Sequence, residues 1–108
     1  MATSETEKRI VEAPCCWSER ECRVRTKYVV SLEDGEILQT IPAMRCYRGV
    51  KKGYIVSVTR PIAIVEHYIS NRGVHYIYIE YSNWEREKAL EVVRRVLGLE
   101  SVEKIITN

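Results

Sequence analysis

Several residue types are scarce in this chain of 108 residues, and some of these shortages exclude classes of protein. Phenylalanine is absent, glutamine occurs once and proline three times. No apolar run approaches the roughly 20 residues that a membrane span requires, so we expect no membrane insertion. The first dozen residues hold no apolar stretch typical of a signal peptide. We therefore expect a cytoplasmic protein.

Sequence motifs typical of enzyme active sites are also absent. It contains no phosphate-binding loop, no dinucleotide-binding glycine pattern, no G-x-S-x-G and no H-E-x-x-H. We therefore expect a protein that is not an enzyme and that carries no cofactor.

The composition indicates one compact, heat-adapted domain. Apolar residues make up 45% of the chain and charged residues 30%, enough for a single core beneath a charged surface. Many Glu, Lys and Arg residues with few Asn and Gln are typical of hyperthermophile proteins, which favours an archaeal or viral source. Residues 1–22 are expected to form a flexible or weakly structured segment, with at most a marginal helix over 5–13. Residues 23–108 are expected to form a single α+β domain.

The clearest local pattern is a β-hairpin at the start of that domain. Residues 23–32 alternate between an apolar set and a polar set, which predicts a half-buried strand. The polar set, expected on the exposed face, is Arg23, Arg25, Lys27 and Ser31. Asp34-Gly35 supplies the positive φ angles of a tight turn, and a second strand follows over 36–41.

Further strands are predicted over 54–59, 61–69 and 74–81. Residues 61–69 are ambiguous because proline suits the first turn of a helix, but their β-branched and aromatic side chains favour a strand. Residues 101–107 fit either a short helix or an edge strand.

One helix is predicted after the last of these strands. Ser82 and Glu85 form the pattern of a capping box, an apolar stripe follows, and Gly98 ends the helix with Leu99 packing back against it. The predicted fold is therefore an antiparallel sheet of about five strands packed on one long C-terminal helix.

The feature most suggestive of function is a basic segment over 44–54, with four cations, two tyrosines and two glycines but no acid. Residues 23–60 as a whole carry eight cations and three acids. Such a surface neutralises phosphates and stacks on bases, so it predicts binding of DNA or RNA; the alternative is a solvated, solubilising surface. The candidate residues are Arg23, Arg25, Lys27, Arg45, Tyr47, Arg48, Lys51, Lys52 and Tyr54.

A second candidate surface consists of tyrosines that alternate with isoleucines. The residues expected to face the helix are Ile77, Ile79 and Tyr81. The other set is then left on the opposite face as candidate interface residues, Tyr68, Tyr76 and Tyr78. Aromatic side chains on an open sheet face are typical of interaction surfaces, which favours a homodimer or a subunit of a larger assembly unless the N-terminal segment covers them.

The cysteines suggest a third alternative, a zinc- or thiol-dependent protein. They are Cys15, Cys16, Cys22 and Cys46, and they lack the paired Cys-x2–4-Cys spacing of structural zinc sites. His67 or His75 would have to complete a mixed site. We therefore assign no metal site and leave free thiols and disulfides open, since disulfides do occur inside heat-adapted cells.

Overall fold

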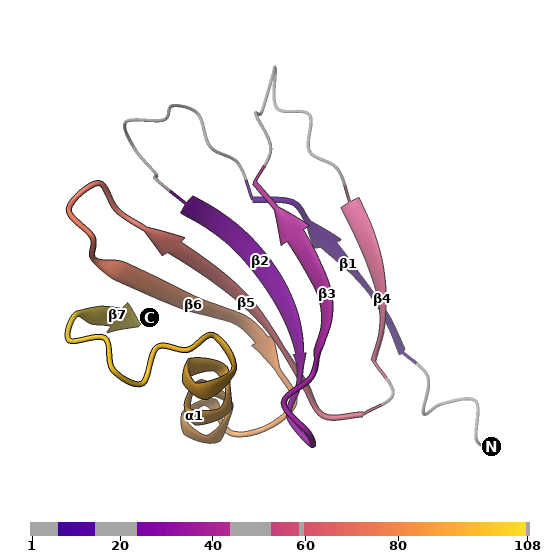
Figure 1. Cartoon of the computed structure of the whole chain (residues 1–108). Coiled ribbons are helices and arrows are strands. Elements are labelled where there is room, and N and C mark those ends of the chain that lie inside the picture. Colours follow the sequence, from indigo (N-terminus) through magenta and orange to yellow (C-terminus); the bar gives the residue numbers. More distant parts are fainter. Residues whose placement is uncertain (1–6, 15–23, 44–52, 59, 108) are drawn as a thin grey trace.

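We describe the fold from a computed structural model, which describes residues 7–14, 24–43, 53–58 and 60–107, and only the backbone of residues 7, 8, 24, 25 and 54–58. In chain order, the elements are β1 (Glu7–Glu12), β2 (Val24–Ser31), β3 (Ile37–Pro42), β4 (Gly53–Val58), β5 (Ile62–Ile69), β6 (His75–Ser82), α1 (Arg86–Val96) and β7 (Ile105–Thr107) (Figure 1).

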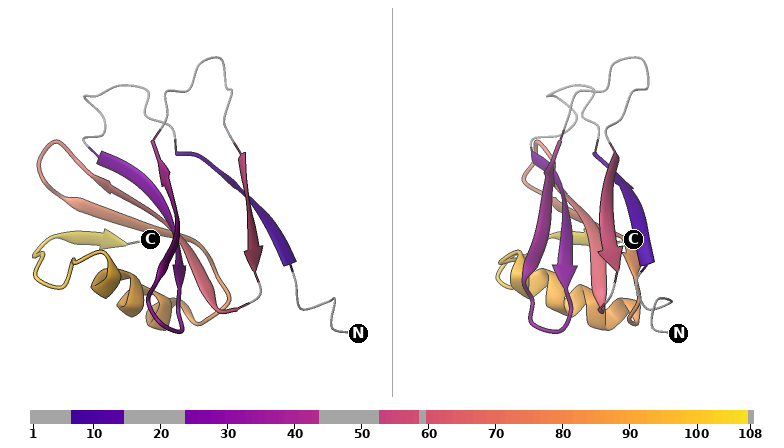
Figure 2. Two further views of the ribbon diagram at one scale, coloured as in Figure 1. Left: turned by 45° about the vertical axis from the view of Figure 1, so that its right-hand side comes forward. Right: turned by 90° about the vertical axis from the view of Figure 1, so that its right-hand side faces the viewer.

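Five strands form one sheet in the order β3-β2-β5-β6-β7. Neighbouring strands in this sheet are antiparallel, except for β6 and β7, which run parallel. Helix α1 covers one face, and β1 and β4 pair as a separate two-stranded sheet on the other side (Figures 1 and 2). The predicted α+β class is confirmed, but the sheet is mixed and the helix, with 11 residues, is shorter than expected.

The two faces of the large sheet bury two separate apolar clusters. The cluster beneath α1 contains Val30, Leu32, Ala63, Val65, Ile77, Ala89, Val92, Val93 and Leu99. The cluster on the opposite face contains Val11, Ala13, Val29, Ile41, Ile62 and Ile64. Strands β2 and β5 contribute to both clusters and are therefore the central layer of the molecule.

The predicted hairpin is present as β2 and β3. Gly35 has a φ of 74°, and its N–H donates to the carbonyl oxygen of Ser31 at 2.9 Å. The backbone N–H of Glu36 donates to Asp34 Oδ1 at 3.0 Å, and this bond is the main reason that the pKa of Asp34 lies below its ordinary value of 3.8. Residues 61–69 also form a strand as predicted, since β5 runs over Ile62–Ile69.

The start of α1 differs from the predicted capping box. Ser82 is the last residue of β6, and its hydroxyl bonds the backbone N–H and carbonyl of Trp84, both at 3.1 Å. The helix begins at Arg86 after Glu85, which makes no side-chain capping bond. The cap fails because sheet pairing with Ala63 holds the Ser82 backbone extended.

The end of α1 is as predicted. The backbone N–H of Leu99 donates to Arg94 at 2.8 Å, and that of Gly98 donates to Arg95 at 3.1 Å. Gly98 has a φ of 70°, and Leu99 is buried against the helix cluster. These two bonds and the left-handed glycine make a Schellman motif.

The N-terminal segment contains a strand where the sequence favours at most a marginal helix. β1 pairs with β4 over six residues, from Glu7 opposite Val58 to Glu12 opposite Gly53. Val11 and Ala13 are buried, so β1 is held to the large sheet by apolar contacts. Among the described residues, no helix is long and apolar enough to cross a membrane.

Candidate functional site

Three tyrosines lie together on the face of the large sheet that is turned away from α1. Tyr68 on β5 opposes Tyr76 on β6, with ring centroids 4.6 Å apart and planes within 6° of parallel. Tyr68 also stacks on Tyr78, with ring centroids 6.0 Å apart and planes within 11° of parallel. All three are partly exposed. We call these three residues the tyrosine stack.

The sequence predicts the faces of Ile77, Ile79, Tyr76 and Tyr78 correctly, but it misplaces Tyr81. Ile77 and Ile79 pack toward α1, whereas Tyr81 packs against the opposite cluster. The cause is a β-bulge, because Val65 pairs with Ile79 while Ile64 pairs with Tyr81 and leaves one extra residue between them.

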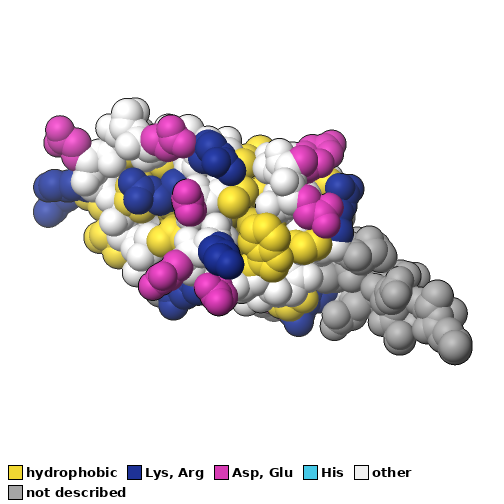
Figure 3. Space-filling model, turned by 90° about the horizontal axis from the view of Figure 1, so that it is seen from below, with side chains coloured by type: hydrophobic (Ala, Val, Ile, Leu, Met, Phe, Trp, Pro, Cys, Tyr) yellow, Lys and Arg dark blue, Asp and Glu magenta, His cyan; other side chains and the backbone are white. Residues whose placement is uncertain are grey.

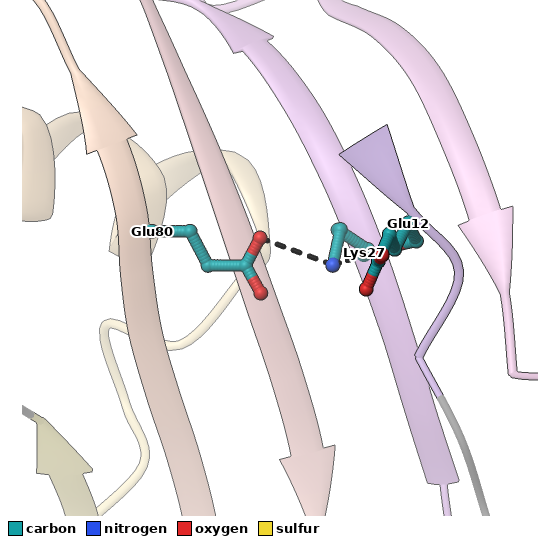
Figure 4. Close-up of polar contacts among 3 residues, drawn as sticks. All are labelled: Glu12, Lys27 and Glu80. Carbon is teal, nitrogen blue, oxygen red and sulfur yellow. Dashed lines mark hydrogen bonds and ion pairs between the residues drawn. The ribbon is translucent and has the colours of Figure 1, made fainter. Parts of the chain in front are cut away.

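Lys27 is buried, although the alternation of β2 predicts it on an exposed basic face. Its ammonium lies 3.0 Å from Glu80 Oε2 and donates to the backbone carbonyl of Glu12 at 2.6 Å (Figure 4). The side chain of Lys27 is 6% exposed and that of Glu80 is 40% exposed. Ser31, on the same face, is also fully buried. Lys27 is therefore a link between β1, β2 and β6 rather than part of an open basic surface.

A pocket of about 280 Å³ lies beside Lys27, between β1 and the large sheet. Its polar and aromatic walls include Arg9, Lys27, Glu80 and Tyr81. The guanidinium carbon of Arg9 lies 3.7 Å from the centroid of the Tyr81 ring, in a cation–π arrangement. We call this cavity the β1 pocket.

Two histidines meet on the face that is covered by α1. His67 Nε2 and His75 Nδ1 are 2.9 Å apart, and the rings stack with centroids at 5.2 Å. One ring must donate an N–H and the other must accept it. Burial, followed by the charge of nearby His75, lowers the pKa of His67 below its ordinary value of 6.5. No group of three or more His, Cys, Asp or Glu suited to a metal ion occurs among the described residues.

Many of the sequence-predicted site residues lie outside the described residues. These are Arg23, Arg45, Tyr47, Arg48, Lys51 and Lys52, together with the four cysteines. For Arg25 and Tyr54 the backbone alone is described, and Arg25 pairs with Tyr68 in the sheet register. The end of β3 and the start of β4, which flank the segment 44–52, lie at the same end of the molecule as the turn between β5 and β6 (Figure 1).

The described surface around α1 carries mixed charge. Seen from below, Lys and Arg side chains are interspersed with Asp and Glu around an apolar area (Figure 3). Trp84, on the segment between β6 and α1, is 41% exposed. A surface of alternating sign attracts a polyanion only weakly, so this face is a poor candidate for binding phosphates.

Sequence reasoning missed the residues of the β1 pocket. Arg9 lies in a segment that we expected to be weakly structured, and Glu80 draws no attention as a single acid in a strand. The alternation of Arg9, Val11 and Ala13 is the one signal that predicts a strand there, but it is too short to predict what the strand covers.

Comparison with known proteins does not assign this geometry to a family. No family model matches the chain, and no curated protein or solved structure matches it.

Proposed function

We propose that this chain is a non-catalytic protein that binds single-stranded nucleic acid. The observation that carries the proposal is the tyrosine stack, three parallel and partly exposed rings on a sheet face that α1 does not cover. Aromatic side chains on such a face stack on unpaired bases, and each stacked base contributes about 1–3 kcal/mol.

Cations for the phosphates would come from residues 44–52, within the basic segment. It contains Arg45, Arg48, Lys51 and Lys52 without any acid. Its described flanks lie at the end of the molecule where β5 turns into β6, and the Arg25 backbone pairs opposite Tyr68. Lys27 is left out of the proposed surface because it is buried and paired with Glu80.

The proposal is tested by fluorescence anisotropy of labelled single-stranded and duplex oligonucleotides at low and physiological salt. We expect a preference for single strands, and Tyr76→Leu should weaken binding by roughly 5- to 150-fold, as expected for the loss of one stacked base. The matched control is Tyr28→Leu, which removes a partly buried tyrosine from the face beneath α1. Equal effects of the two substitutions, or no binding at low salt, would refute the role of the tyrosine stack.

The basic segment has its own test in the salt dependence. Reversing Lys51 and Lys52 to Glu removes two phosphate contacts, so the slope of log K against log salt should fall by about 1.4 for a single strand. Lys88→Glu on the exposed side of α1 is the control and should leave the slope unchanged. An unchanged slope in the Lys51/Lys52 variant would exclude this segment as the phosphate site.

A second candidate function is self-association through the sheet. It is favoured by exposed isoleucines on two strands, Ile10 on β1 at 74% and Ile106 on the edge strand β7 at 48%. Sedimentation over a wide concentration range tests it. A dimer that is weakened by Tyr76→Ser or Ile106→Lys would support self-association, and a monomer at all concentrations would exclude it.

A further inference from the structure

The β1 pocket is lined by Arg9, which has a hydrogen-bond donor that the described residues do not satisfy. Arg9 Nε is buried and has no hydrogen-bond partner there. The guanidinium lies over the face of the Tyr81 ring, a cation–π contact that does not use Nε–H as a hydrogen-bond donor. A buried donor without a partner is costly, so this atom marks a place where an acceptor would bind favourably.

Lys27 adds a further donor to the same pocket. An ammonium has three N–H groups, and two of them are directed to Glu80 Oε2 and to the Glu12 carbonyl. Lys27 also lines the pocket, so its ammonium lies beside the cavity. The unsatisfied Arg9 Nε and the cationic ammonium of Lys27 are both donor groups, so they favour an anionic or carbonyl oxygen as the occupant.

The rest of the pocket limits the charge and the shape of its occupant. Two carboxylates, Glu12 and Glu80, line it along with the two cations, so a doubly charged phosphate would meet repulsion. Apolar walls come from Val11, Ile64 and the Tyr81 ring. An engineered apolar cavity of about 150 Å³ holds benzene, so a pocket of about 280 Å³ has room for a ring-sized ligand.

We infer that the β1 pocket binds a small monocarboxylate with an apolar body. The carboxylate would accept hydrogen bonds from the Arg9 guanidinium, whose planar fork matches two carboxylate oxygens, and from Lys27. The apolar body would lie against Ile64 and Tyr81. This inference does not rest on nucleic-acid binding, because none of the pocket residues belongs to the proposed nucleic-acid surface.

The test is to titrate the full chain with three probes and to monitor binding by two-dimensional proton–nitrogen NMR. The probes are benzoate, its neutral isostere benzamide, and inorganic phosphate. We expect saturable benzoate binding that shifts the Arg9 Nε–H resonance and backbone amides of β1 and Tyr81. Benzamide and phosphate should each bind at least tenfold more weakly, because charge-assisted bonds to a single carboxylate are lost or opposed.

The matched variants are Arg9→Gln and Arg60→Gln. Arg60 is an exposed cation that lies near Asp34, outside the pocket, so its substitution should leave benzoate affinity unchanged. Arg9→Gln should weaken benzoate binding at least tenfold and leave benzamide binding little changed. If Arg9→Gln fails to fold, the benzoate–benzamide comparison on the unaltered chain still decides. No saturable benzoate binding, or equal affinity for benzoate and benzamide, would overturn the inference.

Discussion

Lys27 and Glu80 form an unequal pair, and substitutions on its two sides should have unequal costs. Lys27 is almost entirely enclosed, whereas the carboxylate of Glu80 reaches solvent. In Lys27→Met, the apolar stem is kept, the desolvation cost of the ammonium is removed, and Glu80 is free to hydrate. Replacing a buried ion pair with a hydrophobic side chain is often nearly neutral, so we expect a loss of about 1 kcal/mol or less in the free energy of unfolding.

Glu80→Ala removes the carboxylate 3.0 Å from the Lys27 ammonium and leaves that ammonium buried, with the Glu12 carbonyl still as an acceptor. Breaking a fully buried pair costs roughly 3–5 kcal/mol, and the exposure of Glu80 reduces this, so we expect about 2–3 kcal/mol. Lys27→Ala should cost about 2–5 kcal/mol more than Lys27→Met, because it also removes a methylene, the thioether sulfur and a methyl group and leaves a cavity. Substitution of the more exposed partner should therefore be more damaging than Lys27→Met.

Urea unfolding followed by far-UV circular dichroism measures these differences, and unchanged m-values would show that the compared states are the same. The double variant Lys27→Met/Glu80→Ala completes a cycle and should be less destabilised than the sum of the single variants. Additive effects, or a Lys27→Met cost equal to that of Glu80→Ala, would show that the pair is not coupled as the geometry indicates.

Two further predictions concern a turn and a titration. Gly35→Ala and Gly73→Ala both place a side chain at positive φ, so each should lower the free energy of unfolding in urea by about 1–2 kcal/mol. Gly35→Ala should cost more, because its Cβ would lie 3.3 Å from Val96 Cγ2, whereas a Cβ at Gly73 meets no atom within 4 Å. Equal costs would contradict this difference. Folding lowers the pKa of His67, so the unfolded chain binds more protons than the folded chain below pH 6.5. The free energy of unfolding should therefore be independent of His67 above pH 6.5 and fall as the pH drops below it. His67→Phe should flatten this pH dependence, and an unchanged slope would assign it to other groups.

The parts of the fold that depend on local patterns could be predicted from the sequence. The hairpin of β2 and β3 follows from alternation and a glycine turn, and the end of α1 follows from Gly98 and Leu99. The partner of β1 could not be predicted, because Glu12 and Gly53 are distant in the sequence and the residues of a short strand do not specify which strand it pairs with.

The candidate sites show the same division between local and distant information. Alternation predicts that Tyr76 and Tyr78 share a face, and the register adds that Tyr68 stacks on both. Alternation also predicts an exposed Lys27, and this is wrong because two distant segments supply its cover and its counter-charge. A periodic pattern indicates which side chains share a face, but the burial of a face depends on contacts that the pattern does not contain.

The bulge in β6 has a consequence for how this chain tolerates changes in length. One extra residue in β6 interrupts the alternation of side chains. As a result, the neighbouring residues Glu80 and Tyr81 both lie on the face of the sheet beneath β1. Deleting a single residue there would restore strict alternation and move one of the two to the helix side. Which face of the sheet each β6 side chain occupies therefore depends on the number of residues in the strand as well as on their types. A deletion here should be more damaging than a conservative substitution.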